Sequence, residues 1–561
     1  MVLNRRGFLG AVGAAAAAGL ASSSSGLTDL VLADGGRGAA GEQLRELPFL
    51  RSEGGLLDVG LTIHPQRLQI GDREVFVHTY NGMLPGPGLR FRPGDKLRIN
   101  LINNMLPLGV PLNAPPPACA VRPPEEEDAP PLEPPPHPLE CIPEMINHIA
   151  EGETVIQMNM TTNIHTHGLQ VSPNDPADNI FLKLSPGHSH QYEYEIPDDH
   201  PAGLFWYHPH HHGSTTHQSW EGLTAPMIVE GDIDEVPELA DIADRTIVLS
   251  TLWINQDGST PSAVIIPTGG QMPFTTVPAV PTEMLFLMNG QLGPEIDIRP
   301  GETQRWRVLN SDPHEFMWFE VKDHELYQIG QDGIPFGTPR TVRSIMLPPA
   351  NRAELVIRGG QPGRYRVIGK AYDQGHPGGA RPEKELGTLV VAGPPANGRI
   401  PQRLVEPPKM PDLPVAAHRE FRFKGDISGR RGLGVRFWID GVAFDPDRID
   451  TRVRAGTVEE WTWINEDIFQ HPIHVHVNPF QVIDVQGISE GDTSWQTDPN
   501  IWWDTFRLPP FGRVTIRTYF RPDIPGRNVY PSKTVYHCHI LHHEDNGMMG
   551  VLLIDPPEGR S

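Results

Sequence analysis

The sequence predicts an all-β chain made of three consecutive β-sandwiches. Its 561 residues include 60 prolines and 57 glycines, and they show little of the periodicity of amphipathic helices. Short alternating strands separated by turn residues are typical of β-sandwiches. The length suits three or four domains of ordinary size. An internal threefold repeat then favours three sandwiches in series.

Each repeat opens with a turn dipeptide and continues through a second glycine turn into an alternating strand. The dipeptides favour tight turns between paired strands, and they are Asn81-Gly82, Asn289-Gly290 and Asp440-Gly441. The second turns are 92–95, 299–302 and 454–457, and the expected strands are 97–102, 304–309 and 460–464. The strands end at Asn103, Asn310 and Asn465. We therefore expect domains over residues 45–232, 233–395 and 396–561.

Near the C-terminus, Cys538 stands between two histidines, His537 and His539. If residues 534–540 form a β-strand, the cysteine points to one face and both histidines to the other. A thiolate could then bind one metal while its covalent neighbours bind others, which gives an electron a short through-bond path. Another histidine and a methionine follow. Two histidines, one cysteine and a weak axial thioether are the ligands of a blue-copper electron-transfer site.

The segment 471–476 supplies the imidazole that this site lacks. His474 and His476 are two residues apart and share a face, whereas His471 is an odd number of residues from both and can face the other way. Two more pairs with two-residue spacing lie far upstream, at His165/His167 and His208/His210. The pairs 165/167, 208/210, 474/476 and 537/539 give eight imidazoles. Three coppers in a compact cluster can use that number and leave positions open for oxygen.

The segments HTHG, WYHPHHHG, HPIHVH and HCHILHHEDNGMM resemble the four copper motifs of the multicopper oxidases, which include laccases, ascorbate oxidase and bacterial cuprous oxidases. The resemblance implies cupredoxin-like Greek-key β-sandwich domains and four copper ions, one of type 1, one of type 2 and two of type 3. The implied type 1 ligands are His471, Cys538, His543 and Met548. The implied type 2 ligands are His165 and His474, and the implied type 3 ligands are His167, His208, His210, His476, His537 and His539.

The resemblance also implies roles for three acids, because reduction of O2 needs protons. Glu544 resembles the family's proton donor toward the type 3 pair, and Asp178 the acid near the type 2 copper. Asp175 stays an alternative to Asp178, since the alignment crosses a longer loop here. Asp467 resembles an acid that holds a type 1 histidine. A purely structural role in capping turns is the alternative for each acid.

The second repeat carries no such histidine pair and has only His314 near the corresponding position. We expect the middle domain to hold no copper ligand and to act as a spacer. The copper cluster should then form where the first domain meets the third. Four other histidines are expected outside the ligand set: His211, His212, His217 and His542.

Residues 107–150 form an insert in the first domain that is dense in proline and acid. Such a sequence buries no core and predicts a loop of polyproline character. Cys119 and Cys141 lie within it, and in an oxidising compartment a disulfide between them is expected. An acidic flap that collects metal cations is the functional alternative.

The N-terminal segment 1–33 contains Arg5-Arg6 followed by a run of small apolar residues and serines. This pattern predicts a signal for twin-arginine export to the periplasm or the exterior. The run is too short and too weakly apolar for a stable membrane span. The formal net charge of −23 argues against nucleic acid and anionic membranes as partners.

The predicted reaction is one-electron oxidation of phenols or aryl amines at the type 1 copper, coupled to reduction of O2 to water. We expect the substrate to dock at an exposed edge of His471 or His543. Oxidation of Cu(I), Mn(II) or Fe(II) is the first alternative, and a copper-free periplasmic scaffold is the second. The 15 methionines form no dense cluster, which favours phenols over Cu(I). The resemblance implies that three domains can act as a monomer.

Overall fold

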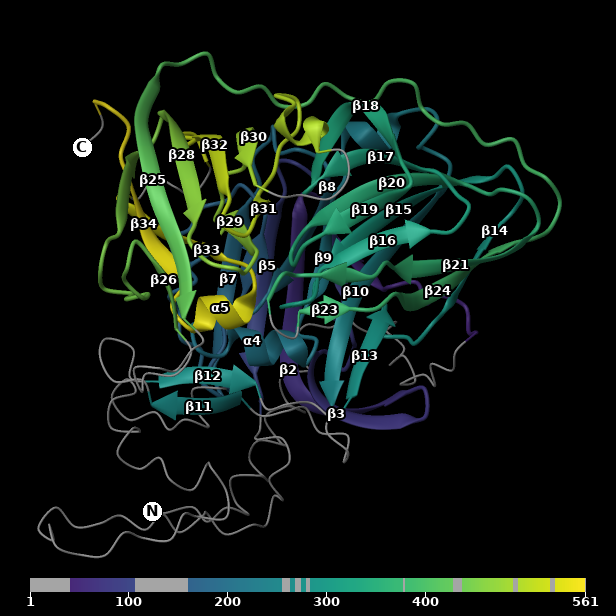
Figure 1. Ribbon diagram of the computed structural model, residues 1–561, viewed down its shortest axis with the longest axis horizontal. Helices are drawn as coiled ribbons and strands as arrows, with labels where there is room; N and C mark the ends of the chain where they lie inside the picture. The colour runs from purple at the N-terminus through teal and green to yellow at the C-terminus, as the bar shows by residue number, and fades with distance from the viewer. Residues whose placement is uncertain are drawn as a thin grey trace, which may run out of the picture. The chain divides into compact units, whose positions relative to one another are not determined.

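Strands dominate the computed structural model, which describes residues 41–105, 160–254, 263–267, 274–278, 283–376, 379–426, 436–487, 493–524 and 530–559 (Figure 1). The expected signal segment, the insert at 107–150 and the pairing of Cys119 with Cys141 lie outside these residues, so they stay predictions. Within the described residues, no helix has both the length and the apolar character needed to cross a membrane.

The first sandwich consists of a four-stranded and a five-stranded sheet. The four-stranded sheet has the order β3-β2-β5-β7, with β2 (Leu56–Ile70), β3 (Arg73–Tyr80), β5 (Lys96–Asn103) and β7 (Ser189–Glu195). The other sheet has the order β1-β4-β9-β8-β6, with β1 (Phe49–Arg51), β4 (Gly88–Phe91), β6 (His165–His167), β8 (Gly203–His208) and β9 (Ala225–Val229). Apolar side chains from both sheets share one buried core. A short helix, α4 (Thr215–Trp220), follows β8.

The second sandwich repeats this plan with more strands. One sheet has the order β13-β10-β15-β20-β17-β18, with β10 (Ala243–Ile254), β13 (Glu283–Met288), β15 (Thr303–Asn310), β17 (Leu326–Gln331), β18 (Ile334–Val342) and β20 (Arg352–Arg358). The other has the order β14-β24-β21-β16-β19, with β14 (Glu295–Ile298), β16 (Met317–Val321), β19 (Ser344–Leu347), β21 (Gly363–Gly369) and β24 (Lys384–Val391). Two two-stranded ribbons and one 3-10 turn complete the described part of this region: β11 (Ala263–Pro267) with β12 (Phe274–Pro278), β22 (Tyr372–Asp373) with β23 (Ala380–Arg381), and η2 (Asp232–Glu235).

The third sandwich has two five-stranded sheets. One has the order β26-β25-β28-β32-β30, with β25 (Val415–Asp426), β26 (Arg436–Ile439), β28 (Val458–Asn465), β30 (Phe480–Gln486) and β32 (Arg513–Tyr519). The other has the order β27-β34-β33-β29-β31, with β27 (Thr451–Arg454), β29 (His471–Val475), β31 (Thr505–Leu508), β33 (Ser532–Cys538) and β34 (Met549–Asp555). The turn η3 (Ser494–Thr497) and the helix α5 (Leu541–Asp545) lie in the loops. The predicted fold class is confirmed, while the domain boundaries at 232 and 395 stay predictions.

The threefold repeat is visible in the backbone and in one side chain. All three opening dipeptides have positive φ at both residues, as a type I′ turn requires. The strands after the second glycine turns, β5, β15 and β28, each pair in parallel with the long strand that precedes the dipeptide. The asparagine that ends each of them donates from its amide Nδ2 to two backbone carbonyls. These asparagines are Asn103, Asn310 and Asn465. The expected strands 97–102, 304–309 and 460–464 are therefore confirmed.

One predicted strand begins and ends two residues earlier than expected. The strand expected at 534–540 is β33, which ends at Cys538. His539 lies beyond it, where its backbone N–H donates to Pro472 O at 2.6 Å. Strand β33 lies between β34 and β29, with Ile473 opposite Cys538 and His474 opposite His537. This register brings two of the histidine motifs side by side.

Candidate metal centres

The structure gathers the predicted ligands into two buried groups. The ten ligand histidines are at most 3 % exposed, and Cys538 and Met548 have no exposed surface. We call Cys538 with His471 and His543 the cysteine group. We call the other eight the eight-histidine group: His165, His167, His208, His210, His474, His476, His537 and His539. Both groups draw only on the first and third sandwiches, from strands β6, β8, β29 and β33 and the loops that follow them.

The cysteine group brings three ligand atoms together. Cys538 Sγ lies 3.5 Å from His471 Nδ1 and 3.6 Å from His543 Nδ1, and the two nitrogens are 3.2 Å apart. His471 comes from β29 and His543 from α5, which begins just after the strand that carries the cysteine. The backbone of Met548 bonds to both neighbours, because its N–H donates to His543 O and its carbonyl accepts from Cys538 N. Met548 packs in the same buried cluster as the cysteine.

The protonation of His471 and Cys538 in this group suits the binding of a cation. His471 Nε2 lies 3.1 Å from Asp467 Oδ1, so Nε2 carries the proton and Nδ1 presents a lone pair toward the sulfur. Burial raises the pKa of the Cys538 thiol well above its ordinary value. A thiolate is therefore costly here unless a cation compensates it. The donor set fits copper, which favours thiolate and imidazole ligands.

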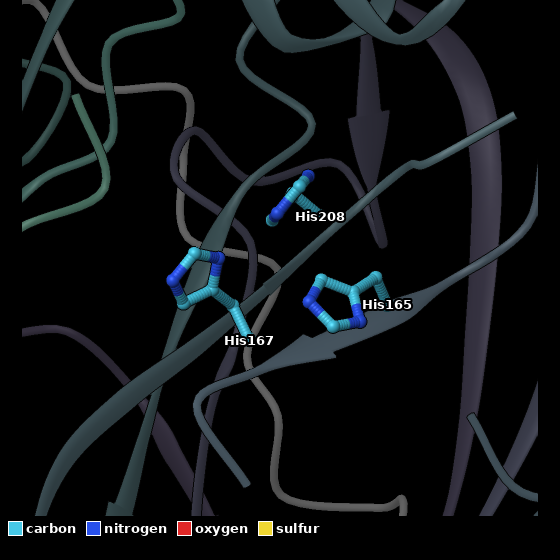
Figure 2. A group of neighbouring side chains, drawn as sticks. All are labelled: His165, His167 and His208. Atoms are coloured by element: carbon cyan, nitrogen blue, oxygen red, sulfur yellow. The ribbon is translucent and has the colours of Figure 1, made fainter. Parts of the chain in front are cut away.

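The eight-histidine group divides into three subsets by the atoms that face one another. His165 Nε2 and His474 Nε2 are 3.4 Å apart. His537 Nε2 lies 3.1 Å from both His210 Nε2 and His476 Nε2. The remaining three are His167, His208 and His539, whose ring centroids lie 4.9 to 5.7 Å apart. Other combinations are also close: Figure 2 shows the rings of His165, His167 and His208 around a common space, and their ligand atoms lie within 4.8 Å of one another.

Unpaired nitrogens support a metal role for the third subset. Within the described residues, His167 Nδ1, His208 Nε2 and both ring nitrogens of His539 are buried without a hydrogen-bond partner. Buried polar atoms are normally paired, so unpaired nitrogens on three neighbouring rings call for a ligand. The second nitrogen of His208 is fixed, since its Nδ1 lies 2.9 Å from Pro209 O. Burial, helped by neighbouring histidines, lowers the pKa of all three, which keeps them neutral as metal binding requires.

The three predicted acids lie beside the two groups. Asp178 Oδ2 lies 2.8 Å from His165 Nδ1, and Asp178 Oδ1 accepts from Thr166 N at 2.8 Å. Burial raises the pKa of Asp178 to about 7. Asp175, the alternative, lies at the surface and faces His190 instead, at 3.4 Å.

Glu544 is fully buried between two histidines of one subset. Its Oε2 lies 3.1 Å from His537 Nδ1, and its Oε1 lies 3.4 Å from His210 Nδ1. Asp467 contacts His471, and its carboxylate also accepts from the backbone N–H groups of Gly425 and Phe469. These backbone bonds fix the carboxylate that orients the histidine.

Five other histidines named in the sequence analysis lie outside the ligand groups. His211 Nδ1 lies 3.3 Å from Ser214 Oγ, His217 Nε2 lies 3.0 Å from Glu221, and His314 Nδ1 lies 3.0 Å from Glu315. The ring of His212 lies 4.6 Å from that of Phe444, and the ring of His542 lies 6.2 Å from that of His543.

The expectation of an exposed imidazole edge is wrong. His471 has no exposed surface and His543 is only 3 % exposed. The reason is Phe437, which comes from β26 and stacks on the His543 ring with centroids 3.9 Å apart. Phe469 adds a second ring at 5.3 Å. These two aromatic rings form a cover over the His543 imidazole.

Sequence patterns missed Asp504, which precedes β31. Its backbone carbonyl accepts from His474 Nδ1 at 2.7 Å, and its Oδ1 lies 3.2 Å from His167 Nε2. Asp504 stands in no histidine motif and gave no signal in the sequence. The register of β31 against β29, which places Thr505 opposite His474, explains its position.

Comparisons with known proteins identify the family of the chain. Three sequence models described as multicopper oxidase match residues 151–233, 241–391 and 406–558. The chain is 26% identical over 520 residues to a laccase of Bacillus subtilis, with 85% of this chain and 90% of that protein covered. A metallo-oxidase from Campylobacter jejuni has a TM-score of 0.68 at 22% identity, with 92% and 96% of the chains covered. A laccase-like multicopper oxidase from the lignin-degrading bacterium Ochrobactrum sp. has a TM-score of 0.66 at 21% identity, with 91% and 100% covered.

The two structural likenesses support the fold, and the sequence models support the family and its copper cofactors. The ligand-bearing motifs at 165–210 and 471–548 fall inside the matched first and last segments. The chain belongs to the multicopper oxidases, and it is a laccase-like oxidoreductase that uses oxygen.

Proposed function

We propose that this enzyme oxidises phenols or aryl amines one electron at a time and reduces O2 to water with four copper ions. The type 1 copper would be held by His471, Cys538, His543 and Met548. The type 2 copper would be held by His165 and His474, and the type 3 pair by His210, His476 and His537 on one side and His167, His208 and His539 on the other. When bound, the coppers supply the one-electron redox steps and the binding of O2.

The observation that carries this proposal is the divergence of three consecutive side chains. Cys538 points into the cysteine group, while His537 and His539 point into the eight-histidine group. Two peptide bonds therefore join the two groups covalently. Burial of all three side chains keeps water out of this path.

Two acids are placed to handle the protons that O2 reduction consumes. Glu544 faces the Nδ1 atoms of His210 and His537, away from the nitrogens that would bind metal. Asp178 holds the Nδ1 atom of His165 in the same way. We infer that these carboxyl groups hold protons close to the cluster without occupying a ligand position.

Two kinds of observation support phenols or aryl amines as the substrates. The relative from Bacillus subtilis is a laccase, and the scattered methionines offer no evident path for Cu(I). The Phe437 ring stacks on His543, and it favours donors that can transfer an electron through this aromatic ring. The same cover also favours small donors over bulky ones. Metal-ion oxidation therefore stays the second candidate function.

Oxygen uptake by copper-loaded protein tests the proposal. We expect about four coppers per chain, an intense blue absorption, and faster oxygen uptake with dimethoxyphenol than with Cu(I) or Mn(II). Cys538→Ser should abolish the colour and the turnover while the protein stays folded. A Cys538→Ser protein that still oxidised the phenol would refute the covalent path, and faster turnover of a metal ion would establish the second candidate.

A further inference from the structure

The middle sandwich supplies a buried arginine that contacts the eight-histidine group through one carboxylate. Arg352 is the first residue of β20 and has no exposed surface. Its Nη1 donates to Asp504 Oδ1 at 2.9 Å, and its Nη2 donates to Asp504 Oδ2 at 2.6 Å. A two-point contact of this kind fixes both the position and the plane of a carboxylate.

The carboxylate of Asp504 in turn sets the orientation of His167. Its Oδ1 lies 3.2 Å from His167 Nε2, and Thr505 Oγ1 lies 3.3 Å from the same nitrogen. Nε2 is therefore the protonated nitrogen, and Nδ1 keeps the lone pair. His208 and His474 are arranged the other way round, with Nδ1 fixed by a backbone carbonyl and Nε2 directed at the group. His167 thus offers a metal the opposite nitrogen.

This contact lies where all three sandwiches meet. Arg352 Nε donates to the carbonyl of Leu204 in the first sandwich at 3.1 Å. Asn351, its neighbour in the middle sandwich, donates to the carbonyl of Thr505 in the third at 2.9 Å. The side chain of Asp332 accepts from Arg352 N at 2.9 Å.

The arginine also decides what the carboxylate can do. The ligand atoms of His167, His474 and Asp504 lie within 4.8 Å of one another, so these three residues could hold an ion themselves. Both oxygens of Asp504 are occupied by Arg352, which leaves the carboxylate as an orienting group. Gly168 of the HTHG motif makes room for this pair. A methyl group there would lie 2.5 Å from Asp504 Oδ2 and 2.6 Å from Arg352 Nη2.

We propose that Arg352 is a positioning residue of the copper cluster, which holds Asp504 so that His167 binds a type 3 copper through Nδ1 and the carboxylate stays off the metal. The middle sandwich then has a part in the site although it lends no ligand. This inference rests on the proposed copper assignment. It predicts that loss of the arginine disturbs one end of the cluster and leaves the cysteine group intact.

The test compares Arg352→Met with Arg305→Met in copper-loaded full-length protein. Arg305 is the matched control, because it is equally buried in the middle sandwich and forms ion pairs with Asp234 and Glu354. The readouts are copper per chain, blue absorbance, and the electron paramagnetic resonance spectrum of the non-blue copper. We expect Arg352→Met to keep its blue colour, to lose up to one copper per chain, and to show an altered non-blue spectrum. Arg305→Met should keep the wild-type copper content and spectrum.

A second substitution distinguishes a positioning role of Arg352 from a mere loss of packing. In the double variant Arg352→Met/Asp504→Asn the freed carboxylate is gone, so the non-blue spectrum should return toward that of wild type. Arg352→Lys keeps the charge but loses the two-point contact. It should show the same spectral change in weaker form, and it serves as the test if Arg352→Met does not fold. Wild-type spectra in both Arg352 variants, or the same change in Arg305→Met, would overturn the inference. A wild-type protein without copper would instead overturn the proposed function.

Discussion

The same substitution can be made in each of the three sandwiches, at the asparagine that ends β5, β15 or β28. Each donates from Nδ2 to two backbone carbonyls that are buried or partly buried, and accepts one backbone N–H, from Met105, Asp312 or Asp467. Replacement by alanine leaves those groups without partners. Each unpaired buried group costs about 1–3 kcal/mol, and relaxation or a trapped water recovers part of it. We therefore expect each alanine variant to lose about 2–5 kcal/mol from the sandwich that carries it.

The functional consequence should differ among the three. Asn465 holds the carbonyl of Phe469 and the N–H of Asp467, and this loop orients His471. Asn465→Ala should therefore weaken or shift the blue absorption, whereas Asn310→Ala should destabilise the middle sandwich and leave the colour unchanged. Urea unfolding of the copper-free proteins, together with absorption spectra of the loaded proteins, measures both effects. Equal loss of colour in the two variants, or no loss of stability in either, would refute the reasoning.

Further predictions concern the aromatic cover over His543, the buried His200, Gly168 of the HTHG motif and the removal of copper. Phe437→Ala should raise the exposure of His543, increase kcat/KM for bulky phenols relative to small donors, and cost about 3–5 kcal/mol of stability; an unchanged ratio would mean that electrons enter elsewhere. Burial lowers the pKa of His200 from 6.5 to about 4, so its contribution to stability is complete above pH 6.5 and is lost as the pH falls toward 4. His200→Gln should flatten the stability profile in that window, and an unchanged slope would contradict it. Gly168→Ala introduces a side chain at φ +89° against the Arg352–Asp504 pair, so copper content should fall while the blue colour persists. Chelation should lower the thermal midpoint of the wild type by more than that of Cys538→Ser, because the variant has fewer sites to lose.

Periodicity predicted the parts of the site that depend on one strand. Side-chain alternation placed His471 with Cys538 and separated both from His474, and the register of β29 against β33 agrees with it. The alternation argument survives even past the end of β33, where His539 still turns toward the eight-histidine group. The repeat likewise predicted the turns and asparagines, since both are local requirements of one recurring backbone path.

Contacts between distant segments could not be predicted in this way. Arg352 and Asp504 stand in no motif, and they meet only because three sandwiches pack at one junction. The cover over His543 comes from Phe437, on a strand whose position relative to α5 depends on tertiary packing. Periodicity gives the face of a strand, but it does not say what lies against that face.

The division of the histidines between two distant parts of the chain has a consequence for biosynthesis. Four of the eight lie at 165–210 and four at 474–539, with the whole middle sandwich between them. A nascent chain that has emerged only as far as the middle sandwich presents half of the imidazoles and none of the thiolate. The complete eight-histidine group can therefore form only after the third sandwich has been made and has packed against the first.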